Sequence, residues 1–370
     1  MAKPHEGEIP PRPDEKLRFA RIIHHSVQGA SIYSMRMRAK VKYILLWTLA
    51  MALVSADAVA AAPTATMQAI VVRDGKAQLQ TVPRPSPQAG QVRIKVRAAA
   101  VNPADWKRAQ REPNSGRIPG WDVSGVIDSV GRSVRGWKAG DAVIGYLEGH
   151  GGYAQYAVVP VGHIARKPHK LSFNQAAGIP LAAATAWRAL VDEAQLRTGQ
   201  AVLIQGAAGG VGSAAVQIAV ARGAARIIGI ASTQNDRFLR SIGATETIDY
   251  HTAGFEARIR GLDVVLNTVN PATAALSIQM LRPGGVLLST AGAAPAEQCA
   301  AAHVRCVAIQ VLNEIGTPKN QVLTEVGKLA DEGKYTVGID ATFPLAEATR
   351  AWELNQAGHT VGKIILVVPQ

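Results

Sequence analysis

The sequence has little cysteine and few aromatic side chains. Cys299 and Cys306 are the two cysteines among 370 residues, and phenylalanine, tryptophan and tyrosine together make up 5% of the chain. Two cysteines cannot build a framework of several disulfides or a four-cysteine zinc site, so we expect two buried free thiols. With few aromatics and no block of five or six basic residues, a nucleic-acid surface with stacking platforms is not expected.

The composition is that of a globular protein with room for two domains. Hydrophobic residues make up 48% of the chain and charged residues 18%. This balance allows a substantial core. The net charge of +13 is scattered along the sequence. A field of this sign favours an anionic small molecule, such as a dinucleotide phosphate, as a ligand.

Residues 35–60 have the pattern of a secretory signal peptide. Basic residues at 36–42 precede the apolar run 44–54, and the small residues "ADAVAAA" follow. We expect cleavage after Ala60, within an A-x-A site, and export to the periplasm if the source is bacterial. The run is short for a membrane span, so an uncleaved anchor is the second choice. A third reading is a cytoplasmic protein whose signal is not used.

Residues 1–34 precede this pattern and add a basic region too long for a signal peptide that starts at Met1. Met35 or Met37 is a more natural start. We therefore expect residues 1–34 to be a disordered tail or an over-extended reading frame.

The remaining sequence predicts an α/β protein of two domains. Short β-rich segments with glycine and proline turns continue from Met67 to Pro168. From about Ala183, buried strands alternate with helices, which is typical of a doubly wound parallel sheet. We predict a β-rich domain from residues 67–182 and 313–370, and a Rossmann domain at residues 183–312.

A glycine-rich turn, "QGAAGGVG", lies between a predicted strand and a predicted helix. It matches the pattern G-x-G-x-x-G with alanine in place of the first glycine. Glycines here let the backbone approach a pyrophosphate at a helix N-terminus. A tight structural turn is the alternative. The predicted cradle consists of Ala207, Gly209, Gly210, Val211 and Gly212.

The end of the next strand indicates the type of dinucleotide. NAD-binding chains place an acidic residue there, but this strand ends in Ser232, and Arg237 follows nearby. A hydroxyl and a guanidinium can bind a 2′-phosphate, whereas a carboxylate would repel it. The sequence therefore favours NADPH. Arg237 could also be an ordinary solvated helix residue.

The motifs together resemble a known family. "AVNPADWKR", "IPGWDVSGVIDSVG", "LIQGAAGGVGSAAVQIA", "LRPGGVLLSTAG" and "GHTVGKIILVV" occur in this order. They are similar to the zinc-independent quinone oxidoreductases, or zeta-crystallin-like branch, of the medium-chain dehydrogenase/reductase superfamily. The resemblance implies a GroES-like catalytic domain with an inserted Rossmann domain, an active site in the cleft between them, and a homodimer.

Zinc-using relatives have cysteine where this chain has Asn102, and His-Glu where it has Trp121 and Asp122. The nine histidines lack H-x-x-x-H spacing, and a catalytic zinc needs three protein ligands. We therefore expect no metal. The expected activity is hydride transfer from NADPH to a quinone or an α,β-unsaturated carbonyl compound. A catalytically weak NADPH-binding protein and an alcohol dehydrogenase-like carbonyl reductase are the alternatives.

The resemblance also implies roles for single residues. Asn102 and Thr185 would lie beside the nicotinamide, and Tyr250 and Lys363 near the phosphates. The ribose side would be lined by Asn267, Thr268, Ala291 and Gly292. Thr185 could instead cap a helix start, and Tyr250 could be a core residue at a strand end.

The proton donor is open at the sequence level. Tyr146 is the candidate catalytic residue, but tyrosines in glycine-rich strands, including Tyr153, are more often packing residues, and water could supply the proton. Asp105 could be a base or an orienting group, although we expect a solvated loop carboxylate.

Overall fold

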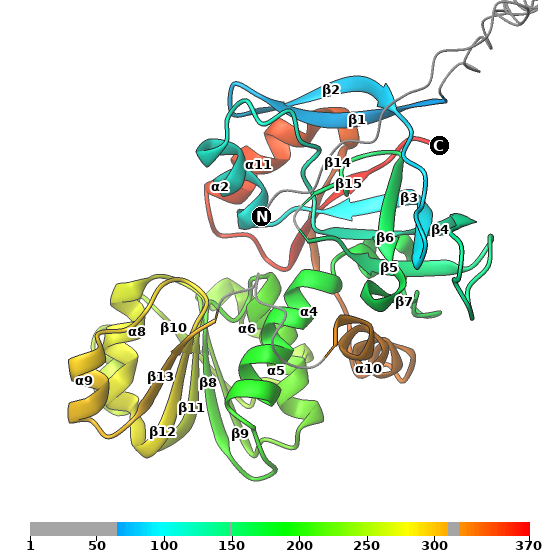
Figure 1. The fold of residues 1–370 in the computed structure, drawn as a ribbon. Coiled ribbons are helices and arrows are strands. Elements are labelled where there is room, and N and C mark those ends of the chain that lie inside the picture. Colours follow the sequence, from blue (N-terminus) through cyan, green and yellow to red (C-terminus); the bar gives the residue numbers. More distant parts are fainter. Residues whose placement is uncertain (1–64, 149, 310–317) are drawn as a thin grey trace, which may run out of the picture. The chain divides into compact units, whose positions relative to one another are not determined.

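The computed structural model describes residues 65–148, 150–309 and 318–370 (Figure 1). The predicted tail at 1–34 and the predicted signal peptide at 35–60 lie outside the described residues. No helix in the described ranges is long and apolar enough to cross a bilayer.

The first lobe is built on a mixed sheet of seven strands within the described chain, with strand order β14-β15-β3-β4-β5-β7 and β6 paired to β3. A separate antiparallel pair, β1–β2, accompanies it. The strand bounds are β1 Thr66–Arg73, β2 Lys76–Pro83, β3 Gln91–Ala100, β4 Asp122–Val130, β5 Ala142–Tyr146, β6 Tyr156–Pro160, β7 Ile164–Arg166, β14 Ile339–Pro344 and β15 Lys363–Val367. Its helices are α2 Pro103–Arg111, α3 Phe173–Ala177, α10 Lys319–Asp331 and α11 Ala348–Gln356.

Two strands from distant parts of the sequence meet in the centre of this lobe. Strand β3 alternates between buried and half-buried residues along "QVRIKVR", which is the period of a strand with one face in the core. Strand β15, from the C-terminal end, pairs antiparallel with β3 at Ile365 and Ala100. The C-terminal segment therefore returns to the first sheet and brings Lys363 close to the start of α2.

The second lobe is a six-stranded sheet in the order β10-β9-β8-β11-β12-β13, in which all pairs are parallel. The strands are β8 Ala201–Gln205, β9 Arg226–Ala231, β10 Glu246–Asp249, β11 Leu262–Asn267, β12 Leu281–Ser289 and β13 Arg305–Ala308. The helices are α4 Pro180–Trp187, α5 Gly210–Ala221, α6 Asp236–Ser241, α7 Phe255–Arg258, α8 Pro271–Ser277 and α9 Ala296–Ala301. Short 3₁₀ or π turns lie at Val161–His163, Arg188–Glu193, Thr233–Asn235, Ile278–Met280 and Leu345–Glu347.

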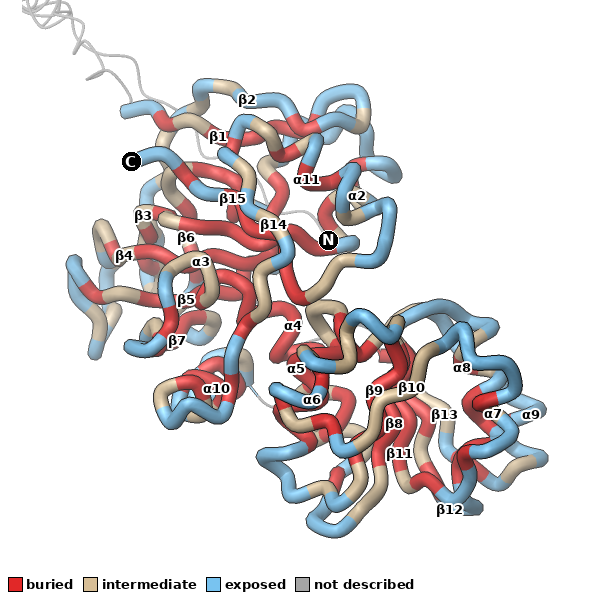
Figure 2. The backbone as a smooth tube through the Cα atoms, turned by 180° about the vertical axis from the view of Figure 1, so that it is seen from behind, coloured by how far each residue is buried: buried red, intermediate tan, exposed pale blue. Residues whose placement is uncertain are grey.

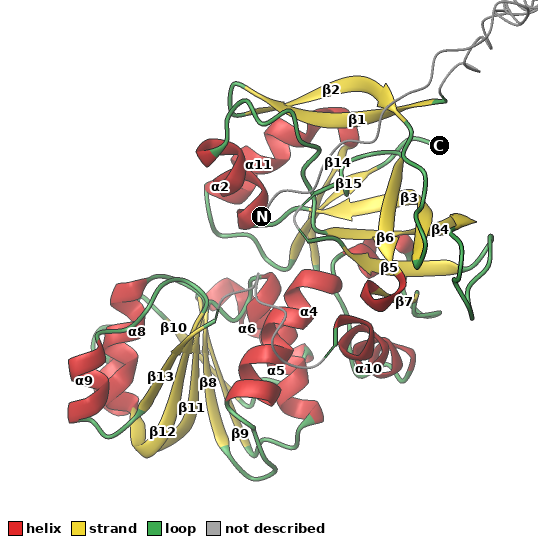
Figure 3. Cartoon of the chain, viewed as in Figure 1, coloured by secondary structure: helices red, strands yellow, loops and turns green. Residues whose placement is uncertain are grey.

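Burial explains why these strands are continuously apolar. Figure 2 shows the central strands β8 and β11 as buried, with exposed residues concentrated on the surrounding loops and helices. Helix α5 packs against β8 and β9, whereas α8 packs against β11 and β12. The central strands β8 and β11 are covered on both faces and so carry no polar face (Figure 3).

Helix α4 is apolar around its whole circumference. Residues from Pro180 to Ala186 are all buried. The helix contacts β4 and β5 of the first sheet and α5 of the second lobe. An all-apolar helix of this kind is stable only when it is covered on all sides, so α4 holds the two lobes against each other.

The prediction of two free thiols is wrong. Cys299, on α9, and Cys306, on β13, form a disulfide bond with a Cα–Cα distance of 6.2 Å. The two residues are only seven apart in sequence, yet α9 packs back on β13 and brings them within bonding reach. The prediction excluded a framework of several disulfides correctly, but it did not consider a single local bond.

Candidate functional site

A pocket of about 1190 Å³ is lined by residues of both lobes. One wall is the glycine-rich turn between β8 and α5, with the carboxyl ends of β9 and β10. The opposite wall is formed by residues at the start of α2 and by residues 358–360 and 362–364. In a parallel sheet, ligands bind beyond the carboxyl ends of the strands, and this pocket has that position.

The glycine-rich turn is shaped by close backbone packing. Gly206 has φ +68, a left-handed conformation that favours glycine. A Cβ on Gly212 would lie 2.2 Å from the Gly206 carbonyl oxygen and 2.7 Å from Ala207 Cα. Helix α5 can therefore begin directly over the turn. Its N-cap, Gly209, has no side chain that could accept a hydrogen bond from the first turn. The first N–H groups of the helix are therefore left for a ligand.

The predicted cradle residues divide into two groups. Gly209, Gly210 and Val211 line the pocket, together with Ala208, which the sequence reasoning did not name. Ala207 and Gly212 are not among the lining residues and instead support the turn from behind. The cradle is tied to the first lobe because the Gly362 N–H donates to the Ala208 carbonyl at 2.8 Å.

Strands β9 and β10 supply the far end of the pocket. Ser232 and Tyr250 both line it, and Tyr250 is 49% exposed, so it is not a core residue at a strand end. Arg237 is exposed on α6 and is not among the lining residues. Asp249, which the sequence reasoning missed, also lines the pocket. Its carboxylate accepts from the Thr233 side chain and backbone, and these hydrogen bonds lower the pKa of Asp249.

The ends of β11 and β12 contribute Thr268 and Ala291 to the lining. Asn267 lies behind them, and its amide donates to the Asn270 carbonyl at 2.9 Å and to Ser289 Oγ at 3.0 Å. Gly292, at φ +111, packs against Pro271 and is not a lining residue. Contacts of Asn267 and Gly292 with a ribose stay predictions.

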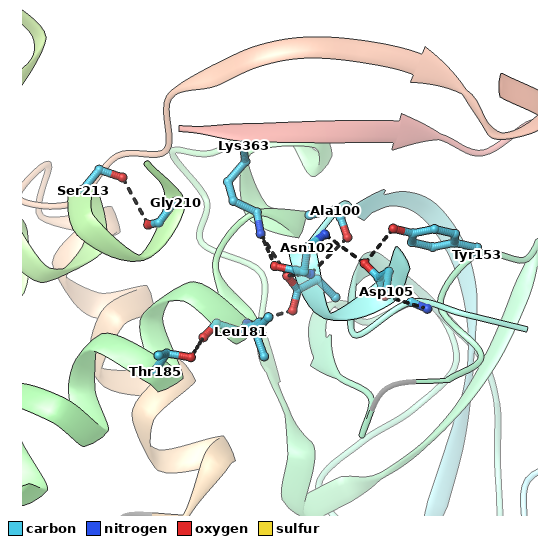
Figure 4. A network of polar contacts seen from close by, with 11 residues as sticks. Ala100, Asn102, Asp105, Tyr153, Leu181, Thr185, Gly210, Ser213 and Lys363 are labelled. Atoms are coloured by element: carbon cyan, nitrogen blue, oxygen red, sulfur yellow. Dashed lines mark hydrogen bonds and ion pairs between the residues drawn. The ribbon is translucent and has the colours of Figure 1, made fainter. Parts of the chain in front are cut away.

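A buried polar cluster lies at the first-lobe end of the pocket (Figure 4). The Lys363 ammonium donates to Asn102 Oδ1 at 2.6 Å and lies 3.4 Å from Asp122 Oδ2. Asn102 Nδ2 donates to the same Asp122 oxygen at 3.0 Å. Burial raises the pKa of Asp122, and the Lys363 charge and the hydrogen bonds oppose this rise. Asn102 and Lys363 line the pocket, whereas Asp122 lies behind them.

Asp105 is not the solvated carboxylate that we expected from the sequence. It is 3% exposed, because α2 begins with a capping box in which the Asp105 carboxylate accepts from the Asn102 N–H at 2.8 Å. Two more groups donate to the Asp105 carboxylate: Tyr153 Oη at 2.8 Å and the Gly120 N–H at 3.1 Å. Burial raises the pKa of Asp105 to about 7. Asp105 therefore fixes the backbone of Asn102.

Thr185 and Tyr146 are buried but are not among the residues that line the pocket. Thr185 lies inside α4, where its hydroxyl donates to the Leu181 carbonyl at 2.7 Å, so it does not cap the helix start. Tyr146, at the end of β5, packs edge-on against Trp121, and burial raises the pKa of its phenol. Catalytic roles for these two residues stay predictions.

The described part of the chain contains no group of three or more histidine, cysteine or acidic residues that could hold a metal ion. Three positions correspond to the zinc ligands that the resemblance implies for zinc-using relatives. Asn102 and Trp121 have side chains that are poor metal ligands. The Asp122 carboxylate is engaged by Asn102, the Leu181 N–H and Lys363.

Comparisons with known proteins identify the family. Residues 88–169 match the alcohol dehydrogenase GroES-like domain, and residues 242–366 match the zinc-binding dehydrogenase family. The chain is 32% identical over 303 residues to the chloroplast envelope quinone oxidoreductase homolog of Arabidopsis thaliana, covering 77% of this chain and 92% of that protein. The chain belongs to the zeta-crystallin-like quinone oxidoreductase branch of the medium-chain dehydrogenase/reductase superfamily.

Other members of this superfamily agree in sequence and fold. The NADPH-dependent alkenal/one oxidoreductase of Arabidopsis thaliana chloroplasts is 32% identical over 292 residues, covering 75% of this chain and 72% of that protein. The quinone oxidoreductase structure from Coxiella burnetii has a TM-score of 0.73 and 32% identity, covering 82% of this chain and all of that one. The prediction of an α/β fold with GroES-like and Rossmann parts is confirmed.

Proposed function

We propose that this protein is an NADPH-dependent, zinc-independent oxidoreductase that reduces quinones or α,β-unsaturated carbonyl compounds. The observation that carries the proposal is one continuous pocket joining the glycine cradle to the buried Asn102–Lys363 pair. The named activities of the quinone and alkenal/one oxidoreductase relatives support it.

The pocket residues fit NADPH. The uncapped N-terminus of α5 provides N–H donors and a partial positive charge for a pyrophosphate. An added Cβ on Gly209 would meet nothing closer than 3.4 Å, so the turn is open on that side. Ser232 replaces the acidic residue of NAD sites, and the Asp249 carboxylate is already engaged by Thr233. When bound, the reduced nicotinamide supplies a hydride.

The protein's own groups would bind and orient the reactants. The Asn102 amide is held by hydrogen bonds at both ends, so its orientation is fixed before a ligand binds. The apolar pocket wall from Val101, Ala182 and Ile364 would exclude water from the reacting atoms. An acceptor that is already electrophilic needs positioning more than it needs a metal ion.

The test is to mix the purified protein with NADPH and a panel of quinones and enones, and to follow the absorbance of the reduced nicotinamide. We expect consumption of NADPH that depends on the acceptor. Tight NADPH binding without consumption across the panel would contradict the proposal and favour a nucleotide-binding protein without turnover. Stoichiometric zinc in metal analysis of active protein would instead support an alcohol dehydrogenase-like reductase.

We also propose that the protein is exported and that its leader is cleaved after Ala60. The tripartite pattern of residues 35–60 supports this, and so does the Cys299–Cys306 disulfide, since disulfides persist mainly in oxidising compartments. N-terminal sequencing of protein from separated cell fractions tests it. A mature end at Ala61 in the periplasm is the expected result, whereas an intact Met35 in the cytosol would contradict it.

A further inference from the structure

The hydrogen bonds of the buried cluster leave one donor unassigned. Both N–H groups of the Asn102 amide are used, by Asp122 Oδ2 at 3.0 Å and by the Ala100 carbonyl at 3.3 Å. An ammonium has three N–H donors. Two of the three N–H donors of Lys363 are directed to Asn102 and Asp122. In the described ranges no third acceptor is found for Lys363, which lines the pocket.

The ammonium lies beyond the phosphate cradle. A Cβ added to Gly210 would lie 2.8 Å from Lys363 Cδ, so it is the aliphatic stem that passes the glycine-rich turn. The head continues to Asn102, where it is 6% exposed. If a dinucleotide extends from Tyr250 across the turn, its nicotinamide end reaches the region of Asn102, and Lys363 Nζ is at this reactive end.

The charges of the cluster disfavour a phosphate as the ligand of Lys363 and favour a group that is neutral when it binds. Asp122 lies 3.4 Å from Lys363 Nζ and balances its charge, and Asp122 Oδ1 accepts from the Leu181 N–H at 2.7 Å. A pyrophosphate next to Nζ would be repelled by the Asp122 carboxylate. A carbonyl oxygen is neutral when it binds, so it brings no full negative charge next to Asp122.

We propose that Lys363 is a catalytic residue whose third N–H binds the carbonyl oxygen of the acceptor and stabilises the negative charge that develops there. This inference rests on the proposed function. In an enone, the β-carbon gains the hydride, the carbon–carbon π pair moves to form the bond between the α-carbon and the carbonyl carbon, and the carbonyl π pair moves onto the oxygen, which becomes an enolate oxygen. Bound NADPH would supply the hydride and would be oxidised by two electrons. A proton from water then adds to the α-carbon and restores the ketone.

In this arrangement Asn102 and Asp122 are positioning residues. They hold the ammonium in place before the acceptor binds, which is the condition under which such a donor is most effective. The stabilisation is therefore available without reorganisation of the site during the reaction.

The experiment compares Lys363→Met with the wild-type protein in two measurements. Methionine keeps most of the stem and removes the donors. We expect kcat with an enone to fall about 100- to 1000-fold, the typical effect of removing one oxyanion donor. The Kd for NADPH, measured on the protein without acceptor by nicotinamide fluorescence, should not change. Lys328→Met removes an exposed lysine of α10 and serves as the matched control, with unchanged values in both measurements.

Two further measurements separate catalysis from structural support. The double variant Asp122→Asn/Lys363→Met removes both buried charges, so it avoids an unpaired carboxylate and should fold while keeping the loss in kcat. Across a series of aryl enones, the loss should be larger for electron-donating substituents, because those acceptors need more stabilisation at oxygen. A purely structural defect would reduce all rates equally.

The inference is overturned if Lys363→Met raises the Kd for NADPH but keeps kcat at saturating cofactor, because Lys363 would then serve the phosphates. It is also overturned if the double variant folds with unchanged kcat. A wild-type protein that consumes no NADPH with any acceptor would instead refute the proposed function, so the two failures are distinguishable.

Discussion

Replacing Asp105 with asparagine should flatten the pH dependence of stability. Burial raises the pKa of Asp105 to about 7 in the folded protein, compared with an ordinary value of 3.8. Between pH 3.8 and about 7, the folded state therefore keeps a proton on Asp105 that the unfolded chain has released. The resulting stabilisation is fully present below pH 3.8 and is lost as the pH rises through the folded pKa.

The size of the effect follows from this difference in pKa. Between pH 5 and pH 8, the folded carboxyl loses most of its proton while the unfolded carboxyl is already ionised. The free energy of unfolding of the wild-type protein should fall by about 2.5 kcal/mol from this group over that interval. The amide that replaces the carboxyl group in Asp105→Asn does not titrate, so the variant should lack this part of the slope.

Urea unfolding of both proteins at pH 5, 6, 7 and 8 measures the two slopes. The substitution also alters the acceptor for the Gly120 N–H, which shifts stability at every pH and leaves the slope unaffected. Asp340→Asn, at an exposed position of β14, is the matched control and should follow the wild-type profile. Parallel profiles for the wild type and Asp105→Asn would contradict this prediction, because Asp105 would then be ionised at every pH tested, stabilised by its three hydrogen-bond donors.

Three other predictions concern the cofactor site and the disulfide. Gly212→Ala should abolish tight NADPH binding and destabilise the protein by about 1–3 kcal/mol, because its Cβ would overlap the Gly206 carbonyl. The control Gly162→Ala, whose Cβ would have no neighbour within 4 Å, should leave NADPH-binding titrations and urea unfolding unchanged. Ser232→Asp should weaken NADPH binding more than NADH binding in parallel titrations, since a carboxylate repels the 2′-phosphate; equal losses would contradict this role. The double change Cys299→Ser/Cys306→Ser should lower the free energy of unfolding by about 2 kcal/mol, and mass spectrometry of the unreduced wild-type protein after alkylation should show no labelled thiol.

Local patterns in the sequence were sufficient to predict the glycine-rich wall of the pocket. The strand, glycine-rich turn and helix from Ala201 to Ala221 are contiguous, so their relation in space is close to their relation in sequence. Ser232 and Tyr250 follow the next two strands, and parallel strands bring their carboxyl ends to one edge. These residues therefore meet in the pocket as the order of elements predicts.

The polar cluster could not be predicted in the same way. Lys363 lies 261 residues from Asn102 and 241 from Asp122, and they meet only because β15 pairs with β3. The resemblance placed Lys363 near the phosphates, but no pattern showed that its ammonium would be buried between an amide and a carboxylate. Asp105 was misjudged because its other two donors, the Tyr153 hydroxyl and the Gly120 N–H, come from distant segments that the local capping-box pattern does not show.

A bound nicotinamide cofactor and an electrophilic acceptor should react in one pocket. The most direct measurement is the stoichiometry of NADPH consumed to enone or quinone reduced, with product identified by mass spectrometry and deuterium supplied at the cofactor's transferable position. We expect one acceptor reduced per NADPH, with deuterium at the β-carbon of the enone product. NADPH consumption without a reduced product, or an enone product without deuterium at the β-carbon, would contradict this expectation.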